Sequence, residues 1–360
     1  MRLLFLIPSL SGGGAENQLR YLASELALKG HEVHIAYIYD GPSKPEMSDI
    51  HLNRFKTQFN YDPRLLCQLF RFVRIIKPEI ILTWNPQMDI LGGIVSRIRQ
   101  IPWIIREPSS ALLYSGTWKD RLRVLIGSGA SAIVSNSIGG QEYWTSKIPS
   151  IRSLVIRNGL VLNGIDKVEA KLPPGINTVD VPILLFAGRF ERSIKQPDLF
   201  LEVIARIKPE IKVLGIMCGE GQEMYELKEL RHSLDLDNEI YFTGYLPSVQ
   251  VWAIMKRASA FVSPSLFEGC PNTVMEAMVC GCPLVVSEIA AHREILDDDS
   301  ALFFNPNDIQ EMADRILKAL NDRVSSKIRS INAKHKTLGW TVVEMARKYE
   351  QLYKDVIKLS

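Results

Sequence analysis

One stretch of the chain combines a strand, a loop and a helix with two carboxylates. It is residues 260–278, Ala260-Phe261-Val262-Ser263-Pro264-Ser265-Leu266-Phe267-Glu268-Gly269-Cys270-Pro271-Asn272-Thr273-Val274-Met275-Glu276-Ala277-Met278. The first four residues predict a short buried strand, and Pro271 predicts the first turn of a helix. Glu268 then lies on the loop at the carboxyl end of the strand, and Glu276 lies inside the helix. Because amide groups at a helix start bind phosphate oxygens, the stretch indicates a site for an anionic ligand.

The same order of strand, loop and helix repeats on both sides of this stretch. Gly281 and Pro283 end its helix, and the next strand is predicted at 284–286. Further strands are predicted at 3–7, 31–37, 79–82, 102–108, 132–135, 154–156, 183–187, 213–218 and 240–245. This alternation predicts an α/β protein with two Rossmann-like parallel-sheet domains that face each other across a cleft.

The length of 360 residues suits two domains better than one core. We place the first domain at 1–165 and the second at 182–340. Between them, residues 166–181 lose periodicity and contain Pro173-Pro174-Gly175, which indicates a linker. A final helix within 341–360 has a mixed apolar stripe and could pack on either domain, including back onto the first.

The net charge of +3 is unevenly distributed along the chain. Residues 1–170 carry 20 Lys and Arg against 14 Asp and Glu, whereas residues 171–360 carry 23 against 26. A basic first half suggests an anionic partner or a membrane surface, although chance surface composition explains it equally well. The predicted helix at 64–77 exposes a row of cations, which is ordinarily a solvated face and alternatively a contact with anionic lipid.

The cysteines and the apolar segments point to the cytoplasm. The five cysteines have no zinc-ligand spacing and indicate a reduced protein. The apolar start of the chain is too short for a signal peptide, and no apolar run reaches the ~18 residues of a membrane span. We expect a cytoplasmic protein, with peripheral contact to the inner face of the membrane through the basic first domain and with no nucleic-acid partner.

Two further patterns suggest other enzyme classes. Gly12-Gly13-Gly14 follows the first predicted strand, but it is not the spaced G-x-G-x-x-G fingerprint of a dinucleotide-dependent oxidoreductase. No acidic residue ends the second strand to hold a ribose, which also argues against that alternative. Asp235-Leu236-Asp237 has the spacing of a metal-binding Asp-x-Asp, but it precedes a strand at a charged helix end. We interpret it as a solvated cap.

Several motifs together resemble the retaining glycosyltransferases of family four. The segment from Glu268 to Glu276 with its flanks looks like their E-x7-E motif, and Gly12-Gly13-Gly14-Ala15-Glu16 is similar to their GGAE loop. Gly188-Arg189 with Lys195 resembles their GR…K pair, and 155–159 resembles their I-x-N-G hinge strand. The matches run in order from residue 11 to residue 294.

The resemblance implies a GT-B fold and a retaining hexosyltransferase. Such an enzyme moves a hexose from a nucleoside-diphosphate sugar to a glycan or lipid-linked acceptor in cell-surface polysaccharide or glycoconjugate synthesis. The nucleotide sugar is its donor substrate, and neither a metal nor another cofactor is expected. Departure of a diphosphate without a metal requires fixed cations, which Arg189 and Lys195 would supply. Glu268 would position sugar hydroxyls, and Glu276 would hold the ribose hydroxyls.

The resemblance also assigns further donor-binding positions in both domains. Those expected to contact the donor are Gly269, Cys270, Asn272, Thr273, Gly13, Gly14, Gly244 and Tyr245. Many members carry a His where this chain reads Arg106-Glu107, so we expect these two residues on the acceptor side. The family is thought to work by front-face substitution, so Glu268 is not assigned as a nucleophile. A catalytically silent sugar-binding relative would have lost Glu268, Arg189 or Lys195, and all three are present.

Overall fold

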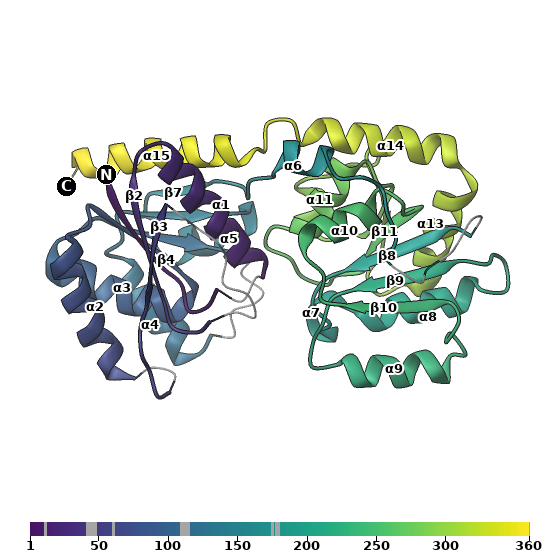
Figure 1. Cartoon of the computed structure of the whole chain (residues 1–360), viewed down its shortest axis with the longest axis horizontal. Coiled ribbons are helices and arrows are strands. Elements are labelled where there is room, and N and C mark those ends of the chain that lie inside the picture. Colours follow the sequence, from purple (N-terminus) through teal and green to yellow (C-terminus); the bar gives the residue numbers. More distant parts are fainter. Residues whose placement is uncertain are drawn as a thin grey trace. The chain divides into compact units, whose positions relative to one another are not determined.

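The computed structural model describes residues 1–10, 13–40, 49–59, 62–108, 116–173, 176 and 181–359. The chain divides into two compact units (Figure 1): unit 1 comprises residues 1–159 and 340–360, and unit 2 comprises residues 160–339. Each unit contains one parallel sheet with helices on both faces, which confirms the prediction of two Rossmann-like α/β domains. Those residues of the predicted linker 166–181 that the structure describes lie within unit 2.

Unit 1 contains a seven-stranded parallel sheet in the order β3-β2-β1-β4-β5-β6-β7. The strands are β1 (Arg2–Leu6), β2 (Glu32–Tyr37), β3 (Ile50–Arg54), β4 (Ile80–Trp84), β5 (Trp103–Glu107), β6 (Ala132–Ser135) and β7 (Ser153–Val155). From β1 the chain adds strands first on one side of the sheet and then, from β4, on the other, so the connections after β1 and β4 run in opposite directions. In open α/β sheets such a switch point is where ligands bind.

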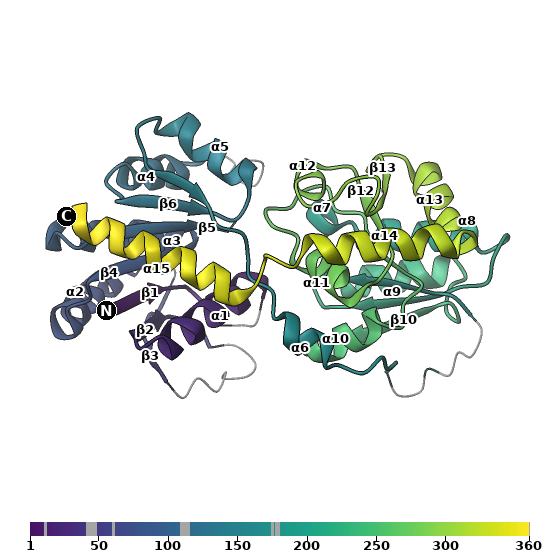
Figure 2. The same cartoon turned by 90° about the horizontal axis from the view of Figure 1, so that it is seen from above.

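Helices cover both faces of this sheet. They are α1 (Gly14–Leu28), α2 (Pro63–Ile76), α3 (Asn85–Arg99), α4 (Trp118–Gly127), α5 (Ile138–Lys147) and α15 (Val342–Leu359). One core joins α1 and α15 to the sheet, and a second core joins α2, α3, α4 and α5 to its other face. The C-terminal helix α15 therefore packs on unit 1 (Figures 1 and 2). Its Tyr349 and Tyr353 are fully buried.

Unit 2 contains a six-stranded parallel sheet in the order β10-β9-β8-β11-β12-β13. The strands are β8 (Ile183–Ala187), β9 (Leu214–Cys218), β10 (Ile240–Gly244), β11 (Ala260–Ser263), β12 (Leu284–Ser287) and β13 (Leu302–Phe304). The helices are α6 (Leu162–Asp166), α7 (Arg192–Lys195), α8 (Pro197–Ile207), α9 (Met224–Ser233), α10 (Ser248–Met255), α11 (Asn272–Cys280), α12 (Ala290–Arg293), α13 (Ile309–Asn321) and α14 (Arg323–Lys336). The switch point lies between β8 and β11.

The strands at this switch point have the sequence that a doubly covered sheet requires. Every residue of β8 and of β11 is buried, because helices cover both faces of the sheet. Both strands coincide with the predicted ones. Helix α11 begins at Asn272, and Pro271 stands at the N-cap position, one residue outside the predicted first turn. No helix among the described residues is long and apolar enough to cross a membrane.

Candidate active site

The loops after β8 and β11 bring Lys195 and Glu268 together at the carboxyl edge of the unit 2 sheet. The two strands pair side by side, and the amide of Leu266 donates to the carbonyl of Ile194 at 2.8 Å, which joins the loops. The Lys195 Nζ lies 2.5 Å from Glu268 Oε1. The structure thus places two of the three predicted catalytic residues in direct contact.

The environment of Glu268 favours its charged form. Its side chain is 8% exposed, and Ser265 Oγ donates to the same Oε1 at 2.8 Å. Burial alone would raise the pKa of Glu268, but the charge of Lys195 and the hydrogen bonds from Lys195 and Ser265 outweigh it. The pKa therefore lies below its usual range. Glu268 is thus an ionised acceptor in a largely dry site.

A buried chain of three serines and one histidine supports the Glu268 loop, and the sequence analysis missed it. Ser263 ends β11, and its hydroxyl lies 3.3 Å from Ser265 Oγ and 3.5 Å from His292 Nε2. Ser287 ends β12 and donates to the carbonyl of Ser265 at 2.5 Å. The Nδ1 of His292 lies 2.8 Å from the carbonyl of Ser287. Burial lowers the pKa of His292, so the ring favours its neutral form.

Arg189, the third predicted catalytic residue, stands apart from this pair. Its side chain is 73% exposed, and Nη1 lies 3.7 Å from a carboxylate oxygen of Glu191. It follows β8 directly, at the same sheet edge as Lys195. Among the described residues no ion pair joins it to Glu268. An exposed guanidinium there is available to an anionic ligand.

Glu276 lies within α11, one helical turn beyond its start. Burial raises the pKa of Glu276 to about 7, and the nearby indole of Trp252 opposes that shift. Among the described residues no ion pair joins Glu276 to a cation. The two carboxylates of the E-x7-E segment are therefore in different electrostatic environments: Glu268 is paired and Glu276 is not.

The first turn of α11 contains two of the predicted donor-binding positions, and the loop before it contains two more. Pro271, the N-cap of this nine-residue helix, supplies no capping side chain. Asn272 and Thr273 are the first two residues of the helix, and both are half-buried. Cys270 differs from expectation, because its side chain is buried with Sγ 3.3 Å from the sulfur of Met275. Only its main chain is then available to a donor. Gly269 lies between Glu268 and Cys270 on the same loop.

Close glycine contacts hold the loops after β8, β9 and β10 together. Gly219 follows β9 with a φ of 144°, and a Cβ there would lie 1.9 Å from the carbonyl oxygen of Gly188. Gly244 has a φ of 69° and accepts a 3.0 Å bond from the Gly219 amide. Glu220 accepts from the amide of Tyr245 at 3.1 Å, and the Tyr245 ring is exposed. The predicted positions Gly244 and Tyr245 thus lie at the same edge of the sheet as Gly188. The contact between the loops after β8 and β9 also requires a glycine at position 219.

The predicted glycine loop of unit 1 lies at the carboxyl end of β1, at the switch point of that sheet. Gly13 is the N-cap of α1 and Gly14 is its first residue, without a capping side chain. Gly12, which belongs to the same motif, lies outside the described residues. The start of α1 thus presents backbone amides at the sheet edge.

Arg106 and Glu107, which we predicted on the acceptor side, are buried within unit 1. They end β5, but they are 2% and 0% exposed. Arg106 donates to the carbonyl of Glu107 at 2.7 Å and to the side chain of Asn158. Glu107 is bound by Arg123 and by the indole of Trp144, both at 2.9 Å. The carboxylate of Glu107 thus binds groups in the core of unit 1 and is not exposed to an acceptor.

The groups that resemble metal ligands lie outside this site. Among the described residues, only Glu32, His34 and His51 form a group of close potential ligand atoms, all within 4.8 Å of one another. They lie on β2 and β3 of unit 1, toward the amino ends of those strands. Asp235 and Asp237, at the end of α9, form surface ion pairs with Lys208 and Arg231 respectively.

Two family models match the chain in succession. The model "Glycosyltransferase Family 4" matches residues 12–163, and the model "Glycosyl transferases group 1" matches residues 171–336. The first thus falls on unit 1 and the second on unit 2.

Relatives and solved structures match over most of their length. The Escherichia coli UDP-Gal:alpha-D-GlcNAc-diphosphoundecaprenol alpha-1,3-galactosyltransferase is 23% identical over 326 residues, covering 82% of this chain and 80% of the relative. The O-antigen biosynthesis glycosyltransferase WclY of E. coli is 24% identical over 379 residues, covering 99% of each chain. The crystal structure of Anabaena Alr3699/HepE in complex with UDP-glucose superposes with a TM-score of 0.86 at 21% identity, covering 99% of this chain and 100% of that chain.

The two parallel-sheet units and the solved structures that share them show the GT-B fold. The chain belongs to glycosyltransferase family 4, since the two models together span nearly its whole length.

Proposed function

We propose that this glycosyltransferase moves a hexose from a UDP-sugar to a lipid-linked glycan acceptor in the synthesis of a cell-surface polysaccharide. Transfer proceeds with retention of anomeric configuration and without a metal. The contact between Lys195 and Glu268 beside the start of α11 carries this proposal. The relatives support the substrate class: one is by name a galactosyltransferase that uses UDP-Gal and a diphosphoundecaprenol-linked sugar, and Alr3699/HepE holds UDP-glucose.

Charge placement is the physical basis of the proposed reaction. As the glycosidic bond to the donor breaks, negative charge grows on the departing diphosphate. Lys195 and Arg189 offer fixed positive charge at the carboxyl end of β8, and the amides that begin α11 add the favourable end of a helix dipole. These groups replace the cation that a metal would otherwise supply.

Glu268 has the properties of a sugar-positioning group in this scheme. It is ionised, largely buried and fixed by Lys195 and Ser265, so it accepts hydrogen bonds from hydroxyl groups without reorganising. Attack by the acceptor on the same face as the departing diphosphate gives retention, and the diphosphate oxygen removes the acceptor proton. No covalent sugar–enzyme bond is required.

A donor screen tests the proposal. Purified protein is incubated with UDP- and GDP-linked hexoses, with and without EDTA, and release of nucleoside diphosphate is measured. We expect turnover with a UDP-sugar, unchanged activity in EDTA, and a product whose anomeric proton keeps the donor's configuration by NMR. Inactivity with every donor, together with no donor binding by calorimetry, would refute the proposal. An inverted product would refute its stereochemical part alone.

A further inference from the structure

Helix α14 of unit 2 has its large apolar side chains on the outside. Val324, Ile328 and Ile331 recur at i, i+4 and i+7, so they share one face, and they are 73%, 54% and 43% exposed. Leu338, just beyond the helix, is 65% exposed in the same register. Figure 2 shows α14 running along the outside of unit 2.

The opposite face of α14 is made of small and polar residues. Ser326, Ser330, Ala333 and Thr337 are buried against unit 2, and the Ser326 hydroxyl donates to the carbonyl of Ala319 at 2.9 Å. A surface helix ordinarily buries its apolar stripe and exposes its small polar residues. This helix does the reverse, and a contiguous exposed stripe of branched aliphatic residues marks a contact surface.

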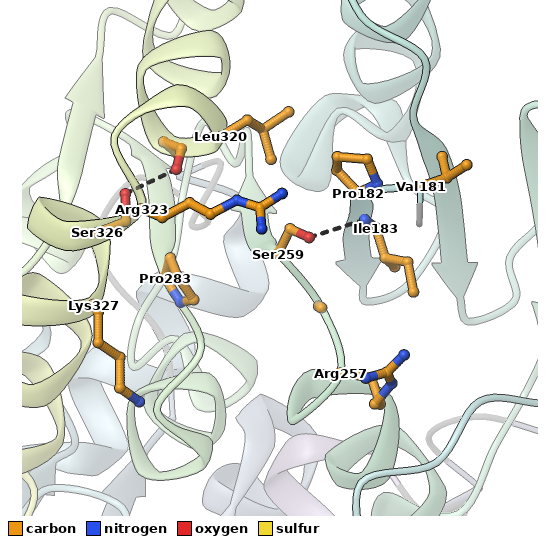
Figure 3. A pocket seen from close by; sticks show the side chains of 12 residues that line it. Val181, Pro182, Ile183, Arg257, Ser259, Pro283, Leu320, Arg323, Ser326 and Lys327 are labelled. Atoms are coloured by element: carbon orange, nitrogen blue, oxygen red, sulfur yellow. Dashed lines mark hydrogen bonds between the residues drawn. The ribbon is translucent and has the colours of Figure 1, made fainter. Parts of the chain in front are cut away.

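The charges beside this stripe are positive. Helix α14 carries five Lys and Arg residues and no Asp or Glu. Along one flank, Arg323 and Lys327 line a solvent-open cavity of about 390 Å³ together with Arg257, and Figure 3 shows these cations around it with Ser259. Among the described residues none of these three cations forms an ion pair with a carboxylate, unlike Lys334 and Lys336 of the same helix.

The cations on the other flank of α14 bond to groups of unit 2. Lys336 pairs with Asp297 at 2.7 Å, and the guanidinium of Arg329 donates to the carbonyl of Asp298. On the cavity side, three cations without a carboxylate partner among the described residues lie together next to the apolar stripe. An apolar stripe beside such cations suits a lipid bilayer, which has an apolar interior and can have anionic headgroups at its surface. A purely apolar protein surface would leave these cations desolvated without a partner.

We propose that the outer face of α14 binds an anionic membrane surface, with Val324, Ile328 and Ile331 inserted among the acyl chains. The cavity lined by Arg257, Arg323 and Lys327 receives a phosphate headgroup. This surface holds unit 2 at the leaflet in which a lipid-linked acceptor resides, and so it deepens the proposed function. It also places membrane contact on the second domain, whereas the sequence led us to expect that contact through the basic first domain.

Vesicle flotation of the full chain tests this proposal. Wild-type protein is mixed with vesicles of phosphatidylcholine alone or with phosphatidylglycerol making up about a third of the lipid. We expect flotation with the anionic vesicles, weakened by salt. Ile328→Glu places a charge in the stripe and is expected to weaken binding at least tenfold. Replacing Arg257, Arg323 and Lys327 together by Gln is expected to weaken it roughly a hundredfold, at ~1 kcal/mol for each cation near the surface.

The matched control is Ile75→Glu on α2. Ile75 is a 75% exposed isoleucine among the cations of that helix, so it tests the competing surface on unit 1. We expect this variant to bind anionic vesicles like the wild type. Loss of binding in Ile75→Glu, wild-type binding in Ile328→Glu, or no vesicle binding by the wild type would overturn the proposal. So would an oligomer that Ile328→Glu dissociates without any change in flotation.

The assay separates this proposal from the proposed function. Hydrolysis of a UDP-sugar in the absence of vesicles requires the donor site but not a membrane. We expect Ile328→Glu to retain wild-type hydrolysis, which also shows that it is folded. An active enzyme that ignores vesicles would refute the membrane surface alone, whereas an inactive enzyme that floats would refute the proposed function alone.

Discussion

The contact between Lys195 and Glu268 makes the sharpest prediction, because its two partners act as one unit. Nζ and Oε1 are 2.5 Å apart, and the side chains are 22% and 8% exposed, so solvent screens the pair weakly. Removing a charged group that stabilises the transition state costs roughly 2–4 kcal/mol. We therefore expect Lys195→Met and Glu268→Gln each to lower kcat/KM for the donor by roughly 30- to 1000-fold.

A double-mutant cycle measures whether the two residues are coupled. In the double variant the second substitution removes a partner that the first has already left unpaired. We expect the double variant to lose less transition-state stabilisation than the sum of the two single variants, by about 1–3 kcal/mol. Donor hydrolysis is assayed for the wild type, both single variants and the double variant. Lys208→Met is the control, since Lys208 also forms ion pairs but at an exposed site beyond α8.

Two results would refute this reasoning. Additive losses in the cycle would mean that the pair has no functional coupling in the working enzyme. Near-wild-type turnover in Lys195→Met or Glu268→Gln would remove that residue from the catalytic assignment. An equal loss in Lys208→Met would show that the assay reports stability, so circular dichroism of every variant accompanies the kinetics.

Three further predictions follow from single contacts. The pKa of Glu276 is about 7 in the folded protein, against an ordinary value of 4.5. Its contribution to the free energy of unfolding is therefore fully present below pH 4.5 and is lost as the pH rises through 7, by at most ~3 kcal/mol. Urea unfolding between pH 5 and 8 should show this loss, and Glu276→Gln should flatten it; an unchanged slope would contradict the assignment. Arg123→Met removes the cation that the buried carboxylates of Asp89 and Glu107 share and should destabilise unit 1 by about 3–5 kcal/mol. Calorimetry should still detect donor binding by unit 2, and a cost under ~1 kcal/mol would show the network to be dispensable. Gly219→Ala should displace the loop after β8 and weaken donor binding at least tenfold, whereas Gly30→Ala, also at positive φ but with no atom within 4 Å of its Cβ, should leave donor binding unchanged. Equal donor affinity in both alanine variants would contradict the contact with Gly188.

The sequence determined those features that depend on neighbouring residues. Apolar runs predict most of the buried strands, though not β13, and their alternation with helical periodicity predicts two parallel α/β units. The same patterns predict that the E-x7-E segment begins at the end of a strand and continues into the start of a helix. Strand β3 was missed, because Ile50–Arg54 is a largely polar edge strand that lacks such a run.

Only the tertiary structure decided which strand-end side chains face a ligand. Arg106-Glu107 and Ser263 stand at equivalent places in the sequence pattern, each at the carboxyl end of a strand. Glu107 is withdrawn into the core by Arg123 and Trp144, which come from two later helices.

The support of the Glu268 loop likewise depends on the assembled sheet. His292 lies 24 residues beyond Glu268 in the chain, and the pairing of β11 with β12 brings it beside Ser263. Local patterns encode backbone geometry and burial, whereas contacts between distant segments exist only once the sheet has assembled. The stretch 260–278 thus specified the position of its carboxylates, and the fold decided their charge: Glu268 is ionised beside Lys195, and Glu276 has a pKa of about 7 because burial leaves it without a cation.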